Sequence, residues 1–219
     1  MKIIGQGRTA DVYALDEAGE RVLRRYRDGS DATREAGVMT RLADHGYPVP
    51  AVLHAEGADL VMERLTGPSL LDALLDGTYE PEPAGELIAG LLDRLHALPE
   101  TRPTRPHGPR LLHLDLHPGN VVLTPGGPVV IDWQTAEEGP PGLDHAVSAL
   151  ILAEVAVSPA PYAPGARAGL AALLSAVRAP LLPHLPAART RRAADPNLTP
   201  GEVAALGAAE SLVRSLAVT

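Results

Sequence analysis

The first quarter of the chain alternates apolar and polar residues, which is the pattern of strands that bury one face. Residues 2–4, 12–15 and 21–26 fit this pattern and are joined by segments that contain glycine. Residues 50–55 and 59–63 repeat it and predict a hairpin. These stretches together predict a small antiparallel sheet.

One helix is predicted to interrupt these strands, over residues 31–45. Asp31 is a residue type that caps helix N-termini. Glu35 lies on the same helical stripe as the apolar residues Met39 and Leu42. We therefore expect the Glu35 carboxylate to face the core, where it needs a cationic partner because an unpaired buried charge is costly.

Beyond Gly67 the pattern changes to long segments rich in alanine and leucine with helical period. Helices are predicted at 69–75, 84–98, 142–157 and 166–178, and a last one opens at a capping box that begins at Thr199. The apolar period of strands returns at 121–132. There two short runs flank the turn sequence Pro-Gly-Gly-Pro and predict a hairpin.

Composition and charge narrow the possible functions. The 219 residues include no cysteine, which excludes disulfides, thiolate zinc sites and cysteine nucleophiles and favours a cytoplasmic location. The net charge of −8 argues against a general nucleic-acid binder. No run approaches the ~20 apolar residues of a membrane helix, so we expect no membrane partner.

The residues with the strongest chemical signal lie around the second hairpin. The run His113-x-Asp115-x-His117-x-x-Asn120 precedes it and Asp132 ends it. Antiparallel pairing brings Asn120 and Asp132 to the same loop, where an amide and a carboxylate oxygen can hold Mg²⁺. Such a set is what phosphoryl transfer requires, since that reaction depends on positioning and charge neutralisation.

With these residues the chain resembles a bacterial member of the aminoglycoside phosphotransferase and choline kinase-like branch of the protein-kinase-like superfamily. The resemblance implies an α+β, two-lobed kinase-like fold that uses ATP and Mg²⁺. It implies that Asp115 accepts the proton of the acceptor hydroxyl, and that Asn120 and Asp132 bind the metal. The expected lobes are residues 1–62 and 68–219, joined by a hinge at 63–67.

The N-terminus agrees with this resemblance. The sequence Gly5-Gln6-Gly7-Arg8-Thr9-Ala10-Asp11-Val12 follows the spacing of the kinase glycine loop. Ala10 stands in place of the third glycine. Gly5 and Gly7 would cover the phosphates and Val12 the adenine.

The resemblance also implies a strand cation on the phosphates, paired with a helix glutamate. Glu35 is the candidate glutamate. Arg24 or Arg25 stands in place of the usual lysine, and Arg24 is favoured because it shares a strand face with Val22. Arginine keeps the charge but has a larger, differently aimed fork.

The resemblance places the adenine edge at the hinge, on two backbone groups. These are the C=O of Glu63 and the N–H of Leu65. The aspartate Asp144 has two interpretations: it ties a following helix to the catalytic loop, or it is a simple N-cap.

Two other functions compete with the kinase. A metal-dependent hydrolase would use the His113-x-Asp115-x-His117 run as ligands. A nucleotide-binding regulatory protein with little turnover would explain the arginine that replaces the strand lysine.

The acceptor is expected to be a small molecule with a hydroxyl group. The segment between Asp132 and the next helix is too short for the peptide-docking segment of protein kinases. Glu137, Glu138 and Glu154 would offer an acidic pocket to an amine-bearing acceptor.

Overall fold

The computed structural model describes residues 1–7, 9–15, 20–99 and 109–217. The chain divides into two compact units. Unit 1 comprises Met1–Pro68 and Val121–Ala136, and unit 2 comprises Ser69–Asn120 and Glu137–Thr219.

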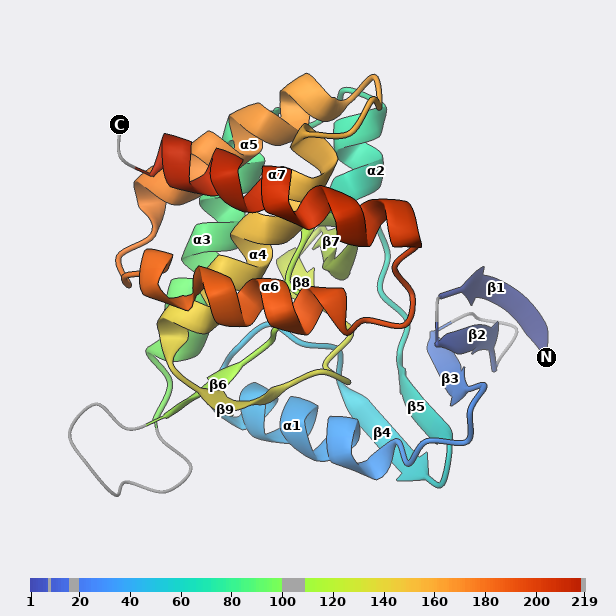
Figure 1. Ribbon diagram of the computed structural model, residues 1–219. Coiled ribbons are helices and arrows are strands. Elements are labelled where there is room, and N and C mark those ends of the chain that lie inside the picture. The colour runs from blue at the N-terminus through green and yellow to red at the C-terminus, as the bar shows by residue number, and fades with distance from the viewer. Residues whose placement is uncertain (8, 16–19, 100–108, 218–219) are drawn as a thin grey trace. The chain divides into compact units, whose positions relative to one another are not determined.

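Unit 1 is built on a five-stranded antiparallel sheet in the order β1-β2-β3-β5-β4 (Figure 1). Its strands are β1 (Lys2–Gln6), β2 (Ala10–Ala14), β3 (Arg21–Tyr26), β4 (Val52–Glu56) and β5 (Asp59–Glu63). The central strand β3 is the most buried, with Val22, Leu23 and Tyr26 in the core. The alternation in the sequence predicted this sheet, and all five strands are present.

Helix α1 (Thr33–Asp44) follows β3 and packs beside β4 (Figure 1). Its buried face includes Glu35, Met39 and Leu42, as the helical stripe predicted. The predicted cap at Asp31 is wrong by one position, because the N-cap is Ala32 and makes no side-chain cap bond. The Asp31 carboxylate instead accepts a hydrogen bond from the Thr33 N–H at 2.9 Å, which forms a turn just before the helix.

The second hairpin, β7 (Val121–Thr124) and β8 (Gly127–Val130), belongs to unit 1. The expected division at residues 63–67 grouped it with the C-terminal lobe instead. It is held to unit 1 by backbone bonds from Leu123 N–H to Pro68 C=O and from Val130 N–H to Pro48 C=O, each 2.9 Å. Gly67 has φ of 137°, and a Cβ there would lie 2.0 Å from the Leu123 oxygen, so only glycine fits.

Unit 2 is mainly helical. Its helices are α2 (Leu70–Leu75), α3 (Pro81–His96), α4 (Pro141–Ala156), α5 (Ala163–Ala176), α6 (Leu185–Ala193) and α7 (Pro200–Leu216), with the 3₁₀ turns η1 (Pro118–Asn120) and η2 (Leu182–His184). Short strands β6 (Arg110–Leu112) and β9 (Glu137–Gly139) pair antiparallel. Helix α4 is the centre of this unit, since it packs against α3, α5, α6 and α7 and is apolar almost all round (Figure 1).

The ends of these helices follow local chemistry. Ser69 and Thr199 both form the two reciprocal bonds of a capping box, at the starts of α2 and α7. Helix α3 begins at Pro81, three residues before the predicted start, because proline is favoured in a first turn. Helix α6 was not predicted from the sequence, and Pro186 stands in its first turn.

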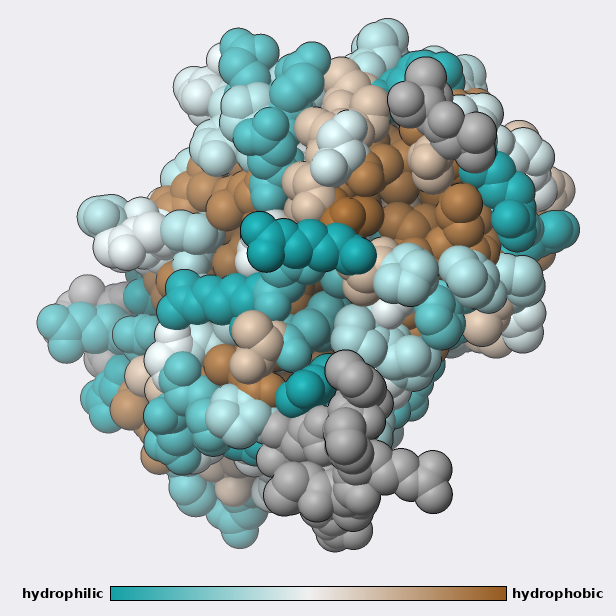
Figure 2. Space-filling view, turned by 90° about the vertical axis from the view of Figure 1, so that its left-hand side faces the viewer, coloured by the Kyte–Doolittle hydropathy of each residue, from teal (hydrophilic) through white to brown (hydrophobic). Residues whose placement is uncertain are grey.

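The described residues include no helix of the length and apolarity that a membrane crossing requires. Large apolar side chains that reach the surface belong to Met1, Ile3, Ile4, Leu53, Leu71, Leu75 and Tyr162. Figure 2 shows one face of the molecule, on which apolar patches are bordered by hydrophilic side chains. Burial of the remaining large apolar residues forms the core of each unit.

Candidate active site

A buried arginine joins two carboxylates in unit 1. Nη1 of Arg24 donates to Oε1 of Glu35 at 3.0 Å, and Nη2 donates to Oδ1 of Asp132 at 2.7 Å. The side chains of Arg24 and Glu35 are 10% and 2% exposed, whereas that of Asp132 is 36% exposed. Arginine can make this double contact because its planar fork carries donors in two directions.

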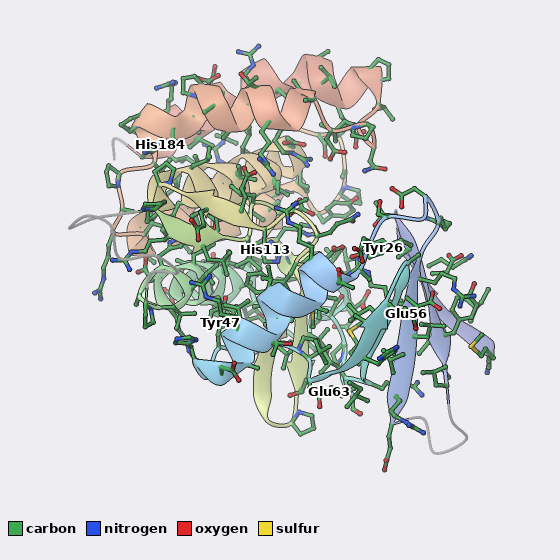
Figure 3. All side chains as sticks on the ribbon, turned by 90° about the horizontal axis from the view of Figure 1, so that it is seen from below. Tyr26, Tyr47, Glu56, Glu63, His113 and His184 are labelled. Atoms are coloured by element: carbon green, nitrogen blue, oxygen red, sulfur yellow. The ribbon has the colours of Figure 1, made fainter. Side chains whose placement is uncertain are left out.

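Glu35 is held by more than the arginine. Its Oε1 also accepts the backbone N–H of Trp133 at 2.8 Å, and Oε2 accepts the hydroxyl of Tyr26, which lies on β3 (Figure 3). The Trp133 ring is buried and meets Tyr47 edge-on at 5.6 Å. The helix glutamate therefore ties α1, β3 and the residue after Asp132 together.

Electrostatics and backbone geometry set this cluster apart. Burial disfavours the charged form of Arg24, but the carboxylates of Asp132 and Glu35 outweigh burial and raise its pKa above the ordinary value. Burial and the nearby Glu35 charge raise the pKa of Tyr26. Asp132 has φ of 66°, a left-handed conformation that is uncommon outside glycine and typical of functional positions.

The side-chain contacts of β3 distinguish its two candidate cations, Arg24 and Arg25. Arg25 points the other way and makes two bonds to the Asp59 carboxylate, at 2.6 and 2.5 Å, on the surface. Arg24 alone of this pair lies beside Glu35 and Asp132. Whether it contacts phosphate stays a prediction.

The glycine-rich segment forms the turn between β1 and β2. Gly5 pairs with Val12 across the strands, and the Gly7 N–H donates to the Ala10 C=O at 2.9 Å. Arg27 braces the turn by donating to the Gly7 oxygen at 2.5 Å. Arg8 of this segment lies outside the described residues. Nucleotide contact by Gly5, Gly7 and Val12 stays a prediction.

The expected hinge follows the last strand of the sheet. Glu63 ends β5, where its N–H donates to the Ala51 C=O and its carboxylate accepts the Ala51 N–H, both at 2.9 Å. Leu65 follows two residues later, outside any helix or strand. The adenine contacts of Glu63 and Leu65 stay predictions.

In unit 2, Asp144 on α4 is fully buried and holds the loop that carries Asp115. Its carboxylate accepts the backbone N–H groups of His113 and Leu114 at 2.8 and 2.7 Å, and Nε2 of His96 lies 2.9 Å away. The N-cap of α4 is Pro140, so the capping interpretation of Asp144 is wrong and the tie to the loop is correct.

This anchor has an electrostatic and a conformational consequence. Burial opposes ionisation of Asp144, but the hydrogen bond and charge of His96 and the bonds from the loop keep its pKa below the ordinary value. Leu114 has φ of 62°, a strained conformation for a branched side chain. The bond to Asp144 stabilises that strained residue directly before Asp115.

The two histidines beside Asp115 brace the same loop. Nδ1 of His113 accepts the Asp115 N–H at 3.2 Å, and Nδ1 of His117 accepts the Gly119 N–H at 3.1 Å. Across the described residues, no group of three or more histidine, aspartate or glutamate side chains is arranged to hold a metal ion. The histidines thus support the loop through these two hydrogen bonds.

Asp115 and Asn120 lie together. Nδ2 of Asn120 donates to the backbone oxygen of Asp115 at 2.9 Å and lies 3.4 Å from its Oδ2. The amide nitrogen thereby faces the loop, which leaves Oδ1 as the atom of Asn120 that suits a metal. The Asp115 side chain is 31% exposed.

Arg192 on α6 is a site residue that sequence reasoning missed. Its guanidinium binds both carboxylate oxygens of Glu154 at 2.9 Å and Oδ2 of Asp195 at 3.1 Å, and Nη1 lies 4.0 Å from Oδ1 of Asp115. Burial disfavours its charge, but the bond to Glu154 and the nearby carboxylates raise its pKa. The one available signal was the Arg-Thr-Arg-Arg sequence at 189–192, among prolines and alanines.

These contacts change the expected acidic pocket. Glu154 is paired with Arg192, and Glu137 is paired with Arg191 at 2.5 Å. Two of the three glutamates predicted to attract an amine are thus neutralised by arginine. Among the predicted site residues, unit 1 brings together Arg24, Glu35 and Asp132, and unit 2 brings together Asp115 and Asn120.

Comparison with known proteins gives a family match and distant structural relatives. The model of the Phosphotransferase enzyme family matches residues 1–109 and 76–184. No curated protein matches the chain. The fold resembles an ethanolamine kinase from Plasmodium vivax with a TM-score of 0.67, 13% identity, and coverage of 98% of this chain and 83% of that one.

Two aminoglycoside phosphotransferases are also similar. A thermostable mutant of APH(4)-Ia without ligand has a TM-score of 0.63 and 17% identity, with coverage of 100% and 95% of the two chains. ADP-bound APH(2'')-Ib has a TM-score of 0.60 and 14% identity, with coverage of 99% and 92%. Likeness at such identities shows a shared kinase-like phosphotransferase fold.

Proposed function

Because the chain belongs to the Phosphotransferase enzyme family, we propose that it transfers the γ-phosphate of ATP to a hydroxyl group of a small molecule. The observation that carries the proposal is the buried arginine of β3, which is paired with the helix glutamate Glu35 and with Asp132. A fixed strand cation beside a carboxylate is what a metal-bound nucleotide phosphate requires. The ADP in the APH(2'')-Ib structure supports a nucleotide as donor.

The residues divide the work of the reaction. Asp115 accepts the proton of the acceptor hydroxyl while the acceptor oxygen forms a bond to the γ-phosphorus. The bond from that phosphorus to the bridging oxygen breaks, and ADP leaves. Arg24 neutralises phosphate charge. Gly5, Gly7 and Val12 cover the nucleotide, and the backbone groups of Glu63 and Leu65 bind the adenine edge.

Asn120 and Asp132 suit Mg²⁺. Both offer oxygen, the ligand type that magnesium prefers. Asn120 turns its amide nitrogen to the loop, and one oxygen of Asp132 makes the bond to Arg24. Val121 pairs with Val130 in the hairpin that separates Asn120 from Asp132 in the sequence. Bound Mg²⁺ would neutralise phosphate charge in the transition state.

A second candidate function rests on the Arg24–Asp132 ion pair. At 2.7 Å the guanidinium already supplies Asp132 with a cation, which would compete with Mg²⁺. A nucleotide-binding regulatory protein with little turnover would keep such a pair. The complete set of Asp115, Asn120 and Asp132 favours the enzyme.

An acceptor screen tests the proposal. Purified protein with Mg-ATP is supplied with ethanolamine, choline, gentamicin or glycerol, and both ADP and the phosphorylated acceptor are quantified by mass spectrometry. We expect one acceptor to give stoichiometric ADP and phosphorylated product, and the matched Asp115→Asn variant to lose at least about 100-fold of that rate. Absence of acceptor-dependent product in every arm, with intact ATP binding, would favour the regulatory function.

A further inference from the structure

The guanidinium of Arg192 is fixed beside the proposed base by carboxylates from two segments. Nε and Nη2 make the parallel pair of bonds to Glu154 of α4, and Nη1 donates to Asp195, just after α6. The side chain is 10% exposed. A two-pronged bond to carboxylate in a buried place holds the guanidinium plane rigidly. These bonds therefore hold the guanidinium in place within unit 2, with Nη1 4.0 Å from Oδ1 of Asp115.

The distance from this guanidinium to Asp115 is unusual for an ion pair. Nη1 of Arg192 and Oδ1 of Asp115 are 4.0 Å apart, which is too far for a hydrogen bond. Nη1 carries two N–H groups, of which one donates to Asp195. Within the described part of the chain Nη1 makes no other hydrogen bond, so its second N–H is a donor next to the base.

An alcohol oxygen fits between these two atoms. An oxygen at about 2.8 Å from both Nη1 and Oδ1 sees them at an angle of about 90°, since 2.8 Å is the ordinary hydrogen-bond length. A hydroxyl group can donate to the carboxylate and accept from the guanidinium at the same time, whereas an ammonium group can only donate. The gap therefore selects a hydroxyl over an amine as the group that receives phosphate.

We infer that the acceptor hydroxyl binds between Asp115 and Arg192, donating its proton to Oδ1 of Asp115 and accepting a hydrogen bond from Nη1 of Arg192. This inference rests on the proposed phosphotransferase function. Arg192 is then a second catalytic residue, because it stabilises the negative charge that grows on the acceptor oxygen as the proton moves to Asp115. The balance of the reaction is unchanged: the oxygen bonds to phosphorus and ADP leaves.

Substitution of Arg192 tests the contact. The assay uses the whole protein, Mg-ATP, and whichever of ethanolamine, choline, gentamicin or glycerol is phosphorylated fastest. We expect Arg192→Ala to lower kcat by roughly 10²- to 10³-fold, the usual loss for one donor to a developing oxyanion. Nucleotide affinity should stay within about twofold, and Arg192→Lys should retain part of the rate because it keeps a charged donor.

The neighbouring arginine is the matched control. Arg191 lies on the same helix and is ion-paired with Glu137, so Arg191→Ala also removes an ion-paired arginine of α6. We expect it to keep the wild-type kcat. Ethylguanidine added at tens of millimolar should restore transfer to Arg192→Ala and leave Asp115→Asn inactive. If ethylguanidine leaves the thermal midpoint of Arg192→Ala unchanged, a purely structural role of Arg192 does not produce this rescue.

The outcomes of these experiments separate the inferred role of Arg192 from the proposed phosphotransferase function. If wild type and Arg192→Ala transfer phosphate equally while Asp115→Asn does not, the inference fails and the proposed function stands. If Arg192→Ala loses transfer only in proportion to its loss of folded protein and ethylguanidine restores none, Arg192 is structural and the inference fails. If wild type phosphorylates no acceptor, both fail. If Arg192→Ala does not fold, the kcat of Arg192→Lys relative to that of Arg191→Ala tests the inferred role of Arg192 instead.

Discussion

Each unit holds an arginine between carboxylates, but the two clusters differ in one distance. In unit 1 Arg24 touches Asp132 at 2.7 Å, whereas in unit 2 Arg192 stops 4.0 Å short of Asp115. Both arginines are buried, and both are anchored by a helix glutamate. The first carboxylate is therefore in direct contact with a cation, while the second is separated from its arginine by more than a hydrogen-bond length.

Backbone strain accompanies both carboxylates. Asp132 itself has a positive φ, and so does Leu114, the residue before Asp115. In unit 1 the Trp133 N–H is fixed by Glu35, and in unit 2 the Leu114 N–H is fixed by Asp144. In both places a buried carboxylate acts on the backbone next to the functional one, which is how a strained conformation persists in a folded protein.

The largest expected effect on stability is in the unit 1 cluster. Glu35→Ala removes the acceptor for Arg24, Tyr26 and the Trp133 N–H and leaves the arginine with one carboxylate fewer in a buried site. We expect the free energy of unfolding to fall by about 3–5 kcal/mol. Urea denaturation followed by circular dichroism measures it, and a loss below about 1 kcal/mol would show that the cluster is not structural.

The next largest effect is expected at Asp144, which anchors the loop that carries Asp115. Asp144→Asn keeps the shape of the side chain but replaces the charged carboxylate, whose oxygens accept the N–H groups of His113 and Leu114, with a neutral amide. We expect a loss of about 1.5–3 kcal/mol in unfolding free energy, the range for hydrogen bonds to charged groups. Phosphate transfer should fall as well, because Leu114 is no longer held. Unchanged transfer in this variant would argue against loop positioning by Asp144.

The dependence of stability on pH tests the start of α4, where His145 follows Asp144. Burial, and then the charge of His96, lower the pKa of His145 below its ordinary value near 6.5. A depressed folded-state pKa means that the unfolded chain binds the proton more tightly. The stability is therefore present above about pH 6.5 and is lost as pH falls below it. Urea midpoints at pH 5, 6, 7 and 8 should decline on the acid side in wild type and decline less in His145→Gln.

The smallest effect is expected at the exposed arginine of β3. Arg25 pairs with Asp59 at the surface, where ion pairs contribute little. Arg25→Ala should leave both the urea midpoint and the affinity for Mg-ATP at wild-type values, whereas Arg24→Ala should weaken Mg-ATP binding at least about tenfold. A nucleotide affinity that depended on Arg25 would exchange the roles assigned to the two arginines.

Much of this arrangement was predictable because it is local. Alternation predicted the strands of unit 1, and the stripe of Met39 and Leu42 predicted that Glu35 is buried. Strand parity favoured Arg24 over Arg25 as the inward arginine, and the structure confirms that orientation. The capping box at Thr199 predicted the last helix.

What escaped prediction depends on contacts between distant segments. Nothing near Arg192 in the sequence indicates that α6 brings it to Asp115, 77 positions earlier in the numbering, because helix packing sets that distance. Strand β9 was missed since its Glu-Glu-Gly sequence has no strand propensity and exists only through pairing with β6. Asp144 had two interpretations until its bonds to the loop separated them.

Asp132 and Asp115 are assigned different roles, and nucleotide binding measured alongside phosphate transfer separates those roles. Calorimetric titration of Mg²⁺ with a non-hydrolysable ATP analogue is made on wild type, Asp115→Asn and Asp132→Asn. Asparagine is chosen at 132 because it tolerates the positive φ. We expect both variants to lose transfer, Asp115→Asn to bind nucleotide within about twofold of wild type, and Asp132→Asn to bind it at least about tenfold more weakly. Equal loss of nucleotide affinity in both variants, or transfer by Asp115→Asn, would contradict this assignment of roles.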